Sequence, residues 1–140
     1  IDGDQTQIEQ VLLNLCVNGA HAMTVMRKEG ETKGGNLTLK LSVVSEAELF
    51  LFADAISLSK ECFMYVITIK DEGVGIDPAA LDKIFDPFYT TKADGIGTGL
   101  GLSMVYNIMK EHHGAVNVEP NPGSGAIFTI IFPERINCGR

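Results

Sequence analysis

Residues 63–75 read FMYVITIKDEGVG, a strand-like run that ends in acidic residues and two closely spaced glycines. The β-branched residues within 66–69 favour a β-strand. The glycines that follow favour a turn. The sequence therefore predicts a strand that carries a carboxylate, Asp71, at its end and runs directly into a glycine turn.

On either side of this turn, the hydrophobic pattern predicts two long helices and three further strands. Apolar residues recur at helical spacing over 8–27 and 101–112, and Gly114 is expected to end the second helix in a left-handed cap. The remaining predictions are strands at 37–42, 116–118 and 126–132, a short helix at 78–84 and a loop at 46–60. This order of elements predicts an α/β fold, a two-layer sandwich in which α-helices pack on one face of a mixed β-sheet.

The size and composition of the chain predict one globular domain over residues 1–140. Its residues are 45% apolar and 21% charged, which is ordinary for a soluble protein. A formal net charge of −7 argues against a nucleic-acid partner, because phosphate backbones are bound by clustered Lys and Arg. Since no apolar run approaches the roughly 20 residues of a membrane span, we expect no membrane contact by this domain and place any anchor in a longer parent protein.

The cysteines favour a reduced compartment. Cys16, Cys62 and Cys138 are odd in number and lack metal-ligand spacing, so neither a disulfide framework nor a zinc site is expected. We therefore predict a cytoplasmic location.

A pair of amides stands on one edge of the first predicted helix. Asn14 and Asn18 are four residues apart, and His21 lies on the same flank. An amide oxygen is a hard ligand, and Mg²⁺ commonly takes one or two protein oxygens beside phosphate and water. This edge is therefore a candidate metal site, although two such amides also commonly make only surface or capping hydrogen bonds.

Asp71 is a candidate purine-binding residue. A carboxylate at a strand end accepts a hydrogen bond from an exocyclic amine, which adenine carries and guanine lacks at that ring position. Gly73 and Gly75 let the backbone approach a base. The alternative is that this Asp-Glu-Gly sequence forms only a turn.

Four alternating glycines within 95–101 precede the second long helix. Glycines there expose N–H groups beside the positive end of the helix dipole, an arrangement that binds phosphate. The segment lacks the Gly-Lys-Ser/Thr ending of a P-loop, and a polar loop instead of a strand precedes it, which argues against a dinucleotide fingerprint. Lys92 lies just before it, where it either reaches a phosphate or is merely solvated.

Taken in order, the segments 14–18, 71–75, 84–88 and 95–102 resemble the four sequence boxes of the sensor histidine kinase catalytic domain. That family belongs to the ATPase superfamily shared with DNA gyrase, MutL and a heat-shock chaperone, and the resemblance implies its Bergerat-type fold. The resemblance covers about residues 4–133, and it is closest to nitrogen-regulation-type or hybrid sensor kinases.

The resemblance implies ATP and Mg²⁺ as cofactors. It gives catalytic roles to Asn14, Asn18 and Lys92: the two amides ligate Mg²⁺, and the lysine binds phosphate under a lid at about 86–97. It also implies that Asp71 binds the adenine amine. The full nucleotide-binding set that it implies is Asn18, His21, Asp71, Gly73, Gly75, Ile76, Phe88, Lys92, Gly97, Thr98, Gly99, Leu100, Gly101 and Leu102.

Three positions depart from the family pattern. Gly19 and Ala126 stand where Ala and Thr are commoner, and His21 stands where Lys is common. A hydroxyl contact near the adenine-binding carboxylate is then missing or replaced by water. A neutral imidazole is also a weaker phosphate partner than Lys.

The resemblance implies transfer of the ATP γ-phosphate to a histidine on a separate dimerisation domain of the same protein, and indirectly to a response regulator. Hydrolytic relatives place Glu at the position of Asn14, and an amide is a poor base, so transfer is favoured over hydrolysis. Three alternatives stay open: an ATP-hydrolysing conformational module, an anti-sigma-type serine kinase and a degenerate, non-catalytic nucleotide-binding module. The isolated chain is expected to bind ATP without a phosphoacceptor of its own.

Overall fold

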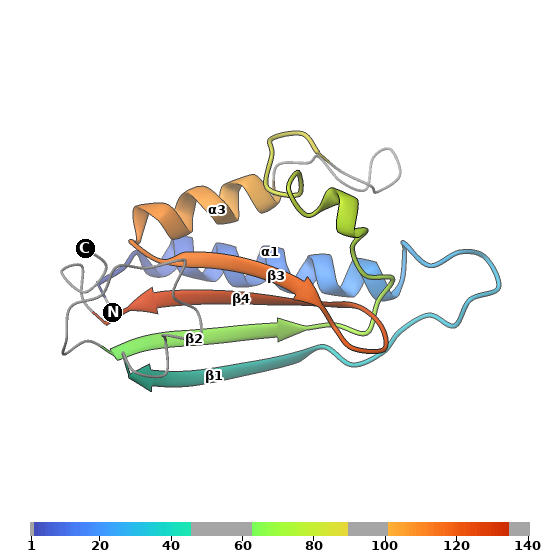
Figure 1. The fold of residues 1–140 in the computed structure, drawn as a ribbon, viewed down its shortest axis with the longest axis horizontal. Helices are drawn as coiled ribbons and strands as arrows, with labels where there is room; N and C mark the ends of the chain where they lie inside the picture. The colour runs from blue at the N-terminus through green and yellow to red at the C-terminus, as the bar shows by residue number, and fades with distance from the viewer. Residues whose placement is uncertain (1, 46–62, 90–100, 135–140) are drawn as a thin grey trace.

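The computed structural model describes residues 2–45, 63–89 and 101–134. Two long helices and four strands make up most of this part of the chain (Figure 1). The elements are α1 (Gln5–Met23), β1 (Thr38–Ser45), β2 (Phe63–Lys70), the 3-10 turn η2 (Pro78–Ala80), α3 (Gly101–Glu111), β3 (Ala115–Pro120) and β4 (Ala126–Pro133). The expected order of elements is confirmed, and the loop predicted at 46–60 lies outside the described residues.

The sheet has the strand order β1-β2-β4-β3, and each of its three neighbouring pairs is antiparallel. The two-layer α/β class is confirmed, but the predicted mixed pairing is wrong for the described strands. β2 and β3 do run in the same direction, as the helix between them suggests. β4 lies between them and pairs antiparallel with both, so no parallel pair forms.

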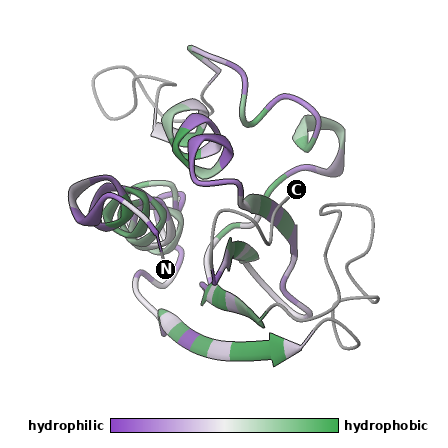
Figure 2. Cartoon of the chain, turned by 90° about the vertical axis from the view of Figure 1, so that its left-hand side faces the viewer, coloured by the Kyte–Doolittle hydropathy of each residue, from purple (hydrophilic) through white to green (hydrophobic). Residues whose placement is uncertain are grey.

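Both helices pack on the same side of the sheet (Figures 1 and 2). Side chains at helical spacing on α1 and α3 face alternating side chains of β2 and β4, and together they form the larger core cluster. Its fully buried members include Val11, Leu15, Ile69, Val105, Met109, Ile130 and Phe132. The core therefore fixes α1 against the end of β2, where the candidate site lies.

The first helix ends earlier than predicted. α1 stops at Met23, and Thr24 leaves helical geometry with φ −129° and ψ −86°. Residues 24–26 continue as turns, and Arg27 N–H donates to the Thr24 carbonyl at 3.0 Å. Thr24 and Val25 are β-branched, which weakens the helix where the apolar periodicity continues. Similarly, the short helix predicted at 78–84 is a 3-10 turn over Pro78–Ala80 followed by further turns.

The end of α3 is a Schellman motif, but its left-handed residue is His113, with φ 56°, and not the predicted Gly114. Gly114 N–H donates to the Met109 carbonyl at 2.9 Å, and His113 N–H donates to the Lys110 carbonyl at 3.0 Å. These bonds satisfy carbonyls that the helix end leaves open. The glycine therefore stands one position beyond the residue that turns the chain.

His112, the residue before this turn, joins the end of α3 to the start of α1. Its Nε2 accepts a hydrogen bond from Asp4 N–H at 3.0 Å, and its Nδ1 lies 2.8 Å from the Ile108 carbonyl oxygen. A carbonyl accepts, so Nδ1 carries the proton and the ring is neutral. Asp4 is also the N-cap of α1, where its side chain accepts from Gln7 N–H at 3.1 Å.

Candidate functional site

Asp71 lies at the centre of the candidate site and is only 3% exposed. Its N–H donates to the Ala126 carbonyl at 3.0 Å, which extends the pairing of β2 and β4 by one residue. Its side-chain Oδ1 accepts from Gly73 N–H at 2.8 Å and from Ala126 N–H at 3.3 Å. Two backbone donors thus fix one carboxylate oxygen.

The other carboxylate oxygen, Oδ2, points toward α1. It lies 3.7 Å from the position that a Cβ would take on Gly19. The small residue at 19 lets a buried carboxylate stand directly against the helix, with one oxygen held by the backbone and one turned toward the helix surface. Such an arrangement suits an acceptor for a ligand N–H group.

Burial raises the pKa of Asp71 above its usual value of 3.8. The hydrogen bonds from Gly73 and Ala126 and the positive charge of Arg27 lower this pKa, but they only partly offset the effect of burial. A buried carboxylate with a perturbed pKa at a strand end is a typical feature of a binding site.

The turn that follows Asp71 packs against the end of α1. A Cβ on Gly73 would overlap the backbone of Ala22, and Val74 N–H donates to the Ala22 carbonyl at 3.0 Å. Only glycine permits this approach. Gly75 follows with φ 77°, as the predicted glycine turn requires.

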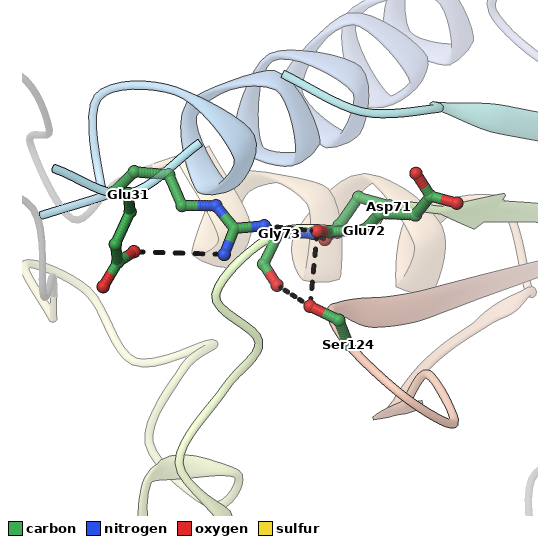
Figure 3. Close-up of polar contacts among 6 residues, drawn as sticks. Glu31, Asp71, Glu72, Gly73 and Ser124 are labelled. Carbon is green, nitrogen blue, oxygen red and sulfur yellow. Dashed lines mark hydrogen bonds and ion pairs between the residues drawn. The ribbon is translucent and has the colours of Figure 1, made fainter. Parts of the chain in front are cut away.

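The β3–β4 turn forms a further wall of the site that the sequence did not predict. Gly125 has φ 94°, and a Cβ there would overlap the Asp71 carbonyl oxygen. Asn121 Nδ2 donates to that same oxygen at 2.9 Å. Ser124 Oγ donates to the Gly73 carbonyl at 2.7 Å (Figure 3). The sequence predicted strands on either side of this segment, at 116–118 and 126–132, but nothing in the segment indicated a contact with residue 71.

The amide edge of α1 faces the start of α3. The Oδ1 and Cγ atoms of Asn14 lie 3.9 Å from the position that a Cβ would take on Gly101. Asn14 Nδ2 is buried and has no hydrogen-bond partner within the described ranges. Asn18 and His21 are half-buried further along the same helix. α1 therefore places Asn14 beside the start of α3, and it also contributes Gly19, which lies against Asp71.

Of the lid expected at about 86–97, only residues 86–89 lie in the described part of the chain. Phe85 is half-buried and its ring centroid lies 5.9 Å from that of Tyr106, so it anchors the segment to the core. Phe88 is 75% exposed and has φ 66°. Ile76 and Leu102 are partly buried and pack against the core cluster. The predicted residues Lys92, Gly97, Thr98, Gly99 and Leu100 lie outside the described residues.

Arg27 is a further residue near the site that sequence reasoning did not identify. It lies four residues beyond α1, and its Nη2 donates to the Glu72 carbonyl at 2.6 Å. The predicted helix through Arg27 gave no sign of this contact, because the side chain reaches the Glu72 carbonyl only after the chain has left helical geometry at Thr24.

Neither of the two long helices described has the length and apolar character that a membrane span requires.

Comparison with known proteins identifies the class. Residues 3–136 match the family model described as histidine kinase-, DNA gyrase B- and HSP90-like ATPase. The chain is 39% identical over 140 residues to the sensor kinase CckA of Brucella abortus (strain 2308), with 97% of this chain and 13% of CckA covered.

Solved structures agree with this match. The catalytic domain of the histidine kinase ThkA superposes with a TM-score of 0.66 at 26% identity, covering 94% of this chain and 70% of that one. Full-length ShkA, solved in complex with AMPPNP, gives a TM-score of 0.62 at 26% identity, with 90% of this chain and 21% of ShkA covered.

The chain belongs to the histidine kinase-, DNA gyrase B- and HSP90-like ATPase family. Within that family it is an ATP-binding domain of the sensor histidine kinase type, with the Bergerat fold. It spans about an eighth of the length of CckA and a quarter of that of sporulation kinase C of Bacillus subtilis, so these relatives are multidomain proteins.

Proposed function

We propose that this domain binds Mg-ATP and transfers the γ-phosphate to a histidine on a separate dimerisation domain of the same protein. The observation that carries the proposal is that two polar groups suited to a nucleotide lie beside α1. A buried carboxylate stands beside Gly19, and an amide with an unmade hydrogen bond stands beside the start of α3. The AMPPNP complex of the similar protein ShkA supports the choice of an adenine nucleotide.

Asp71 is the proposed adenine-binding residue. Its Oδ1 is held by two backbone N–H groups, and its Oδ2 is left to accept from the exocyclic amine of the base. Gly73, Gly75 and Ile76 form the wall of the base pocket, since the first two bring the backbone close and the third packs on the core. A purine with a carbonyl in place of the amine would set acceptor against acceptor.

Asn14 and Asn18 are the proposed Mg²⁺ ligands. The residues fit this role because both are half-buried on one edge of α1 and each offers an amide oxygen, and the Oδ1 of Asn14 lies 3.9 Å from the position that a Cβ would take on Gly101 at the start of α3. When bound, Mg²⁺ would neutralise charge on the triphosphate during phosphoryl transfer.

The phosphates would lie at the start of α3. The residues that would hold them are Gly101 and Leu102, the preceding residues Gly97, Thr98, Gly99 and Leu100, and also Lys92, His21 and Phe88.

Transfer is proposed in preference to hydrolysis, because an amide at position 14 is a poor general base for water. The acceptor would be the imidazole of the dimerisation domain, and a response regulator would receive the phosphoryl group afterwards. We place this reaction in the cytoplasm. The two histidines at the end of α3 do not fit the acceptor role, because His112 is buried with both ring nitrogens engaged and His113 forms the cap of α3.

Two measurements test the proposal. Calorimetric titration with Mg-ATP should give saturable binding. Incubation with γ-labelled ATP should label a separately supplied dimerisation domain of the parent protein and leave this chain unlabelled. The absence of heat at millimolar nucleotide would instead indicate a degenerate module. Steady release of phosphate without any partner would indicate a hydrolytic machine, and transfer to a serine of a supplied partner would indicate an anti-sigma-type kinase.

A further inference from the structure

Arg27 and Asp71 are connected through a single peptide group. Arg27 Nη2 donates to the Glu72 carbonyl at 2.6 Å. The N–H of that same peptide belongs to Gly73, and it donates to Asp71 Oδ1 at 2.8 Å. Because a peptide is planar and trans, its carbonyl and N–H point in opposite directions. The guanidinium on one side therefore fixes the direction in which the N–H points on the other.

The same connection strengthens the hydrogen bond to Asp71. A positive charge on a carbonyl oxygen polarises the peptide and makes its N–H a better donor, and hydrogen bonds in such a chain reinforce one another. Ser124 Oγ donates its one proton to the Gly73 carbonyl at 2.7 Å and lies 3.3 Å from the Glu72 carbonyl oxygen (Figure 3). Arg27 thus holds the Glu72–Gly73 peptide, and the β3–β4 turn holds the peptide that follows it.

Stability alone does not explain the position of Arg27. Its side chain is only 20% exposed, and its Nε is buried without a hydrogen-bond partner in the described part of the structure. A buried donor with an unmade bond costs free energy. Its ion pair with Glu31, at 4.0 Å, is at the limit of contact and joins two residues four positions apart in the turns after α1. Such pairs contribute little.

The charge of Arg27 also acts on Asp71. It lowers the pKa of Asp71 against the opposing effect of burial. The charged neighbours of Asp71 along the chain make contacts of another kind. The Glu72 side chain accepts from Asn36 N–H at 2.8 Å, and Lys70 is exposed on the strand. From α1 and the β3–β4 turn, the described residues Gly19, Asn121, Gly125 and Ala126 lie against Asp71, and none of these four is charged.

We propose that Arg27 is a positioning residue of the adenine pocket: through the Glu72–Gly73 peptide it holds the Gly73 N–H on Asp71 and keeps the free carboxylate oxygen aligned and ionised for the adenine amine. This inference rests on the proposed function, since it assumes that Asp71 binds adenine. It predicts that Arg27 governs the choice of base and the pH dependence of binding without touching the nucleotide.

Three variants separate the effect of the Arg27 charge from the effect of its hydrogen bond to the Glu72 carbonyl. Arg27→Ala removes both charge and donor, Arg27→Gln keeps a neutral donor, and Arg27→Lys keeps the charge without the planar guanidinium. Glu31→Gln is the matched control, because it removes the ion pair and leaves the contact with Glu72. Dissociation constants for Mg-ATP and Mg-ITP would be measured by calorimetry from pH 5 to pH 8. The base of ITP carries a carbonyl where adenine carries its amine.

Arg27→Ala should reduce the preference for Mg-ATP over Mg-ITP by about tenfold, the equivalent of one weakened charge-assisted hydrogen bond. Affinity for Mg-ATP should fall on acidification as Asp71 is protonated, and we call this fall the acid limb of binding. In Arg27→Ala the acid limb should move to higher pH, because the removed charge had lowered the pKa of Asp71. Arg27→Lys should restore the acid limb, Arg27→Gln should restore only part of the base preference, and Glu31→Gln should behave as wild type.

Equal weakening of ATP and ITP binding in Arg27→Ala, with the acid limb in place, would show that Arg27 only supports the fold and would overturn the inference. If Arg27→Ala does not fold, the same comparison is made with the lysine and glutamine variants. A wild-type chain that binds both nucleotides equally, or neither, would instead overturn the proposed role of Asp71. The two failures are therefore distinguishable.

Discussion

Asp71→Asn changes the chemistry of the proposed adenine site while preserving the local structure. The asparagine Oδ1 can still accept from Gly73 N–H and Ala126 N–H, as the aspartate oxygen does at 2.8 and 3.3 Å. Its Nδ2 then replaces the oxygen that faces Gly19. An acceptor becomes a donor at the one atom that would meet the adenine amine, so donor is set against donor.

The expected loss in binding follows from this exchange. A hydrogen bond to a charged group contributes about 1.5–3 kcal/mol. Its removal raises the dissociation constant for Mg-ATP by roughly 10- to 150-fold, since about 1.4 kcal/mol corresponds to a factor of ten. Mg-ITP, whose base offers a carbonyl at that position, should lose much less affinity or gain some.

Asp71→Asn should weaken nucleotide binding without lowering the free energy of unfolding at pH 7. Burial raises the pKa of Asp71 above 3.8, so the folded protein holds this proton more tightly than the unfolded chain. The contribution of Asp71 to the free energy of unfolding is therefore full below pH 3.8 and is lost as the pH rises through the folded value. The asparagine of the variant does not titrate. The variant should be at least as stable as wild type at pH 7, and this advantage should shrink as the pH approaches 4.

Calorimetry with both nucleotides and urea unfolding at pH 7, 5.5 and 4.5 test these expectations together. Asp82→Asn is a suitable control, because Asp82 is exposed and lies outside the proposed pocket. Binding of Mg-ATP within about twofold of wild type by a folded Asp71→Asn chain would refute the assignment of Asp71. A variant less stable at pH 7 than at pH 4.5, relative to wild type, would refute the account of its burial.

Three further substitutions test the supports of the site. His113→Gly should raise the free energy of unfolding by about 1 kcal/mol, because a non-glycine residue at φ 56° carries left-handed strain; urea unfolding that shows a loss would contradict this. His112→Ala should lower it by about 2–4 kcal/mol by removing the ring that joins Asp4 to α3, with faster amide exchange at the start of α1 as the specific sign. Gly125→Ala should cost at least about 1–3 kcal/mol and weaken Mg-ATP binding, since its Cβ would displace the Asp71 carbonyl, and unchanged affinity would argue against that contact.

The sequence predicted well those elements whose pattern is local. The β-branched residues within 66–69 and the glycines at 73 and 75 were enough to place a carboxylate at the end of β2, and the structure confirms it there. Helical periodicity also placed α1 and α3 but misjudged their ends. Apolar spacing continues through Met26 although the backbone has already left the helix at Thr24, because packing of a turn can use the same residues as packing of a helix.

Contacts made by backbone atoms were beyond sequence reasoning. Asn121, Ser124 and Arg27 all act on carbonyl oxygens of residues 71–73, and any residue type presents a carbonyl. A pattern of side chains therefore gives no sign of such partners. Residues that would touch a ligand directly are recognisable by their chemistry, whereas residues that hold the backbone around them become visible only when the chain is folded.

The order of the strands explains how the β3–β4 turn comes to form a wall of the site. If β3 lay beside β2, the turn between β3 and β4 would lie one strand further from Asp71. Because β4 lies between them, Ile127 pairs with Lys70, and Ala126 is brought opposite Asp71 with both its N–H and its carbonyl engaged there. The turn that precedes Ala126 then necessarily meets the turn that follows Asp71. The antiparallel insertion of β4 is thus the feature of the fold that closes the candidate adenine pocket, which is why Gly125→Ala, a change in a turn 54 residues away along the chain, is expected to affect nucleotide binding.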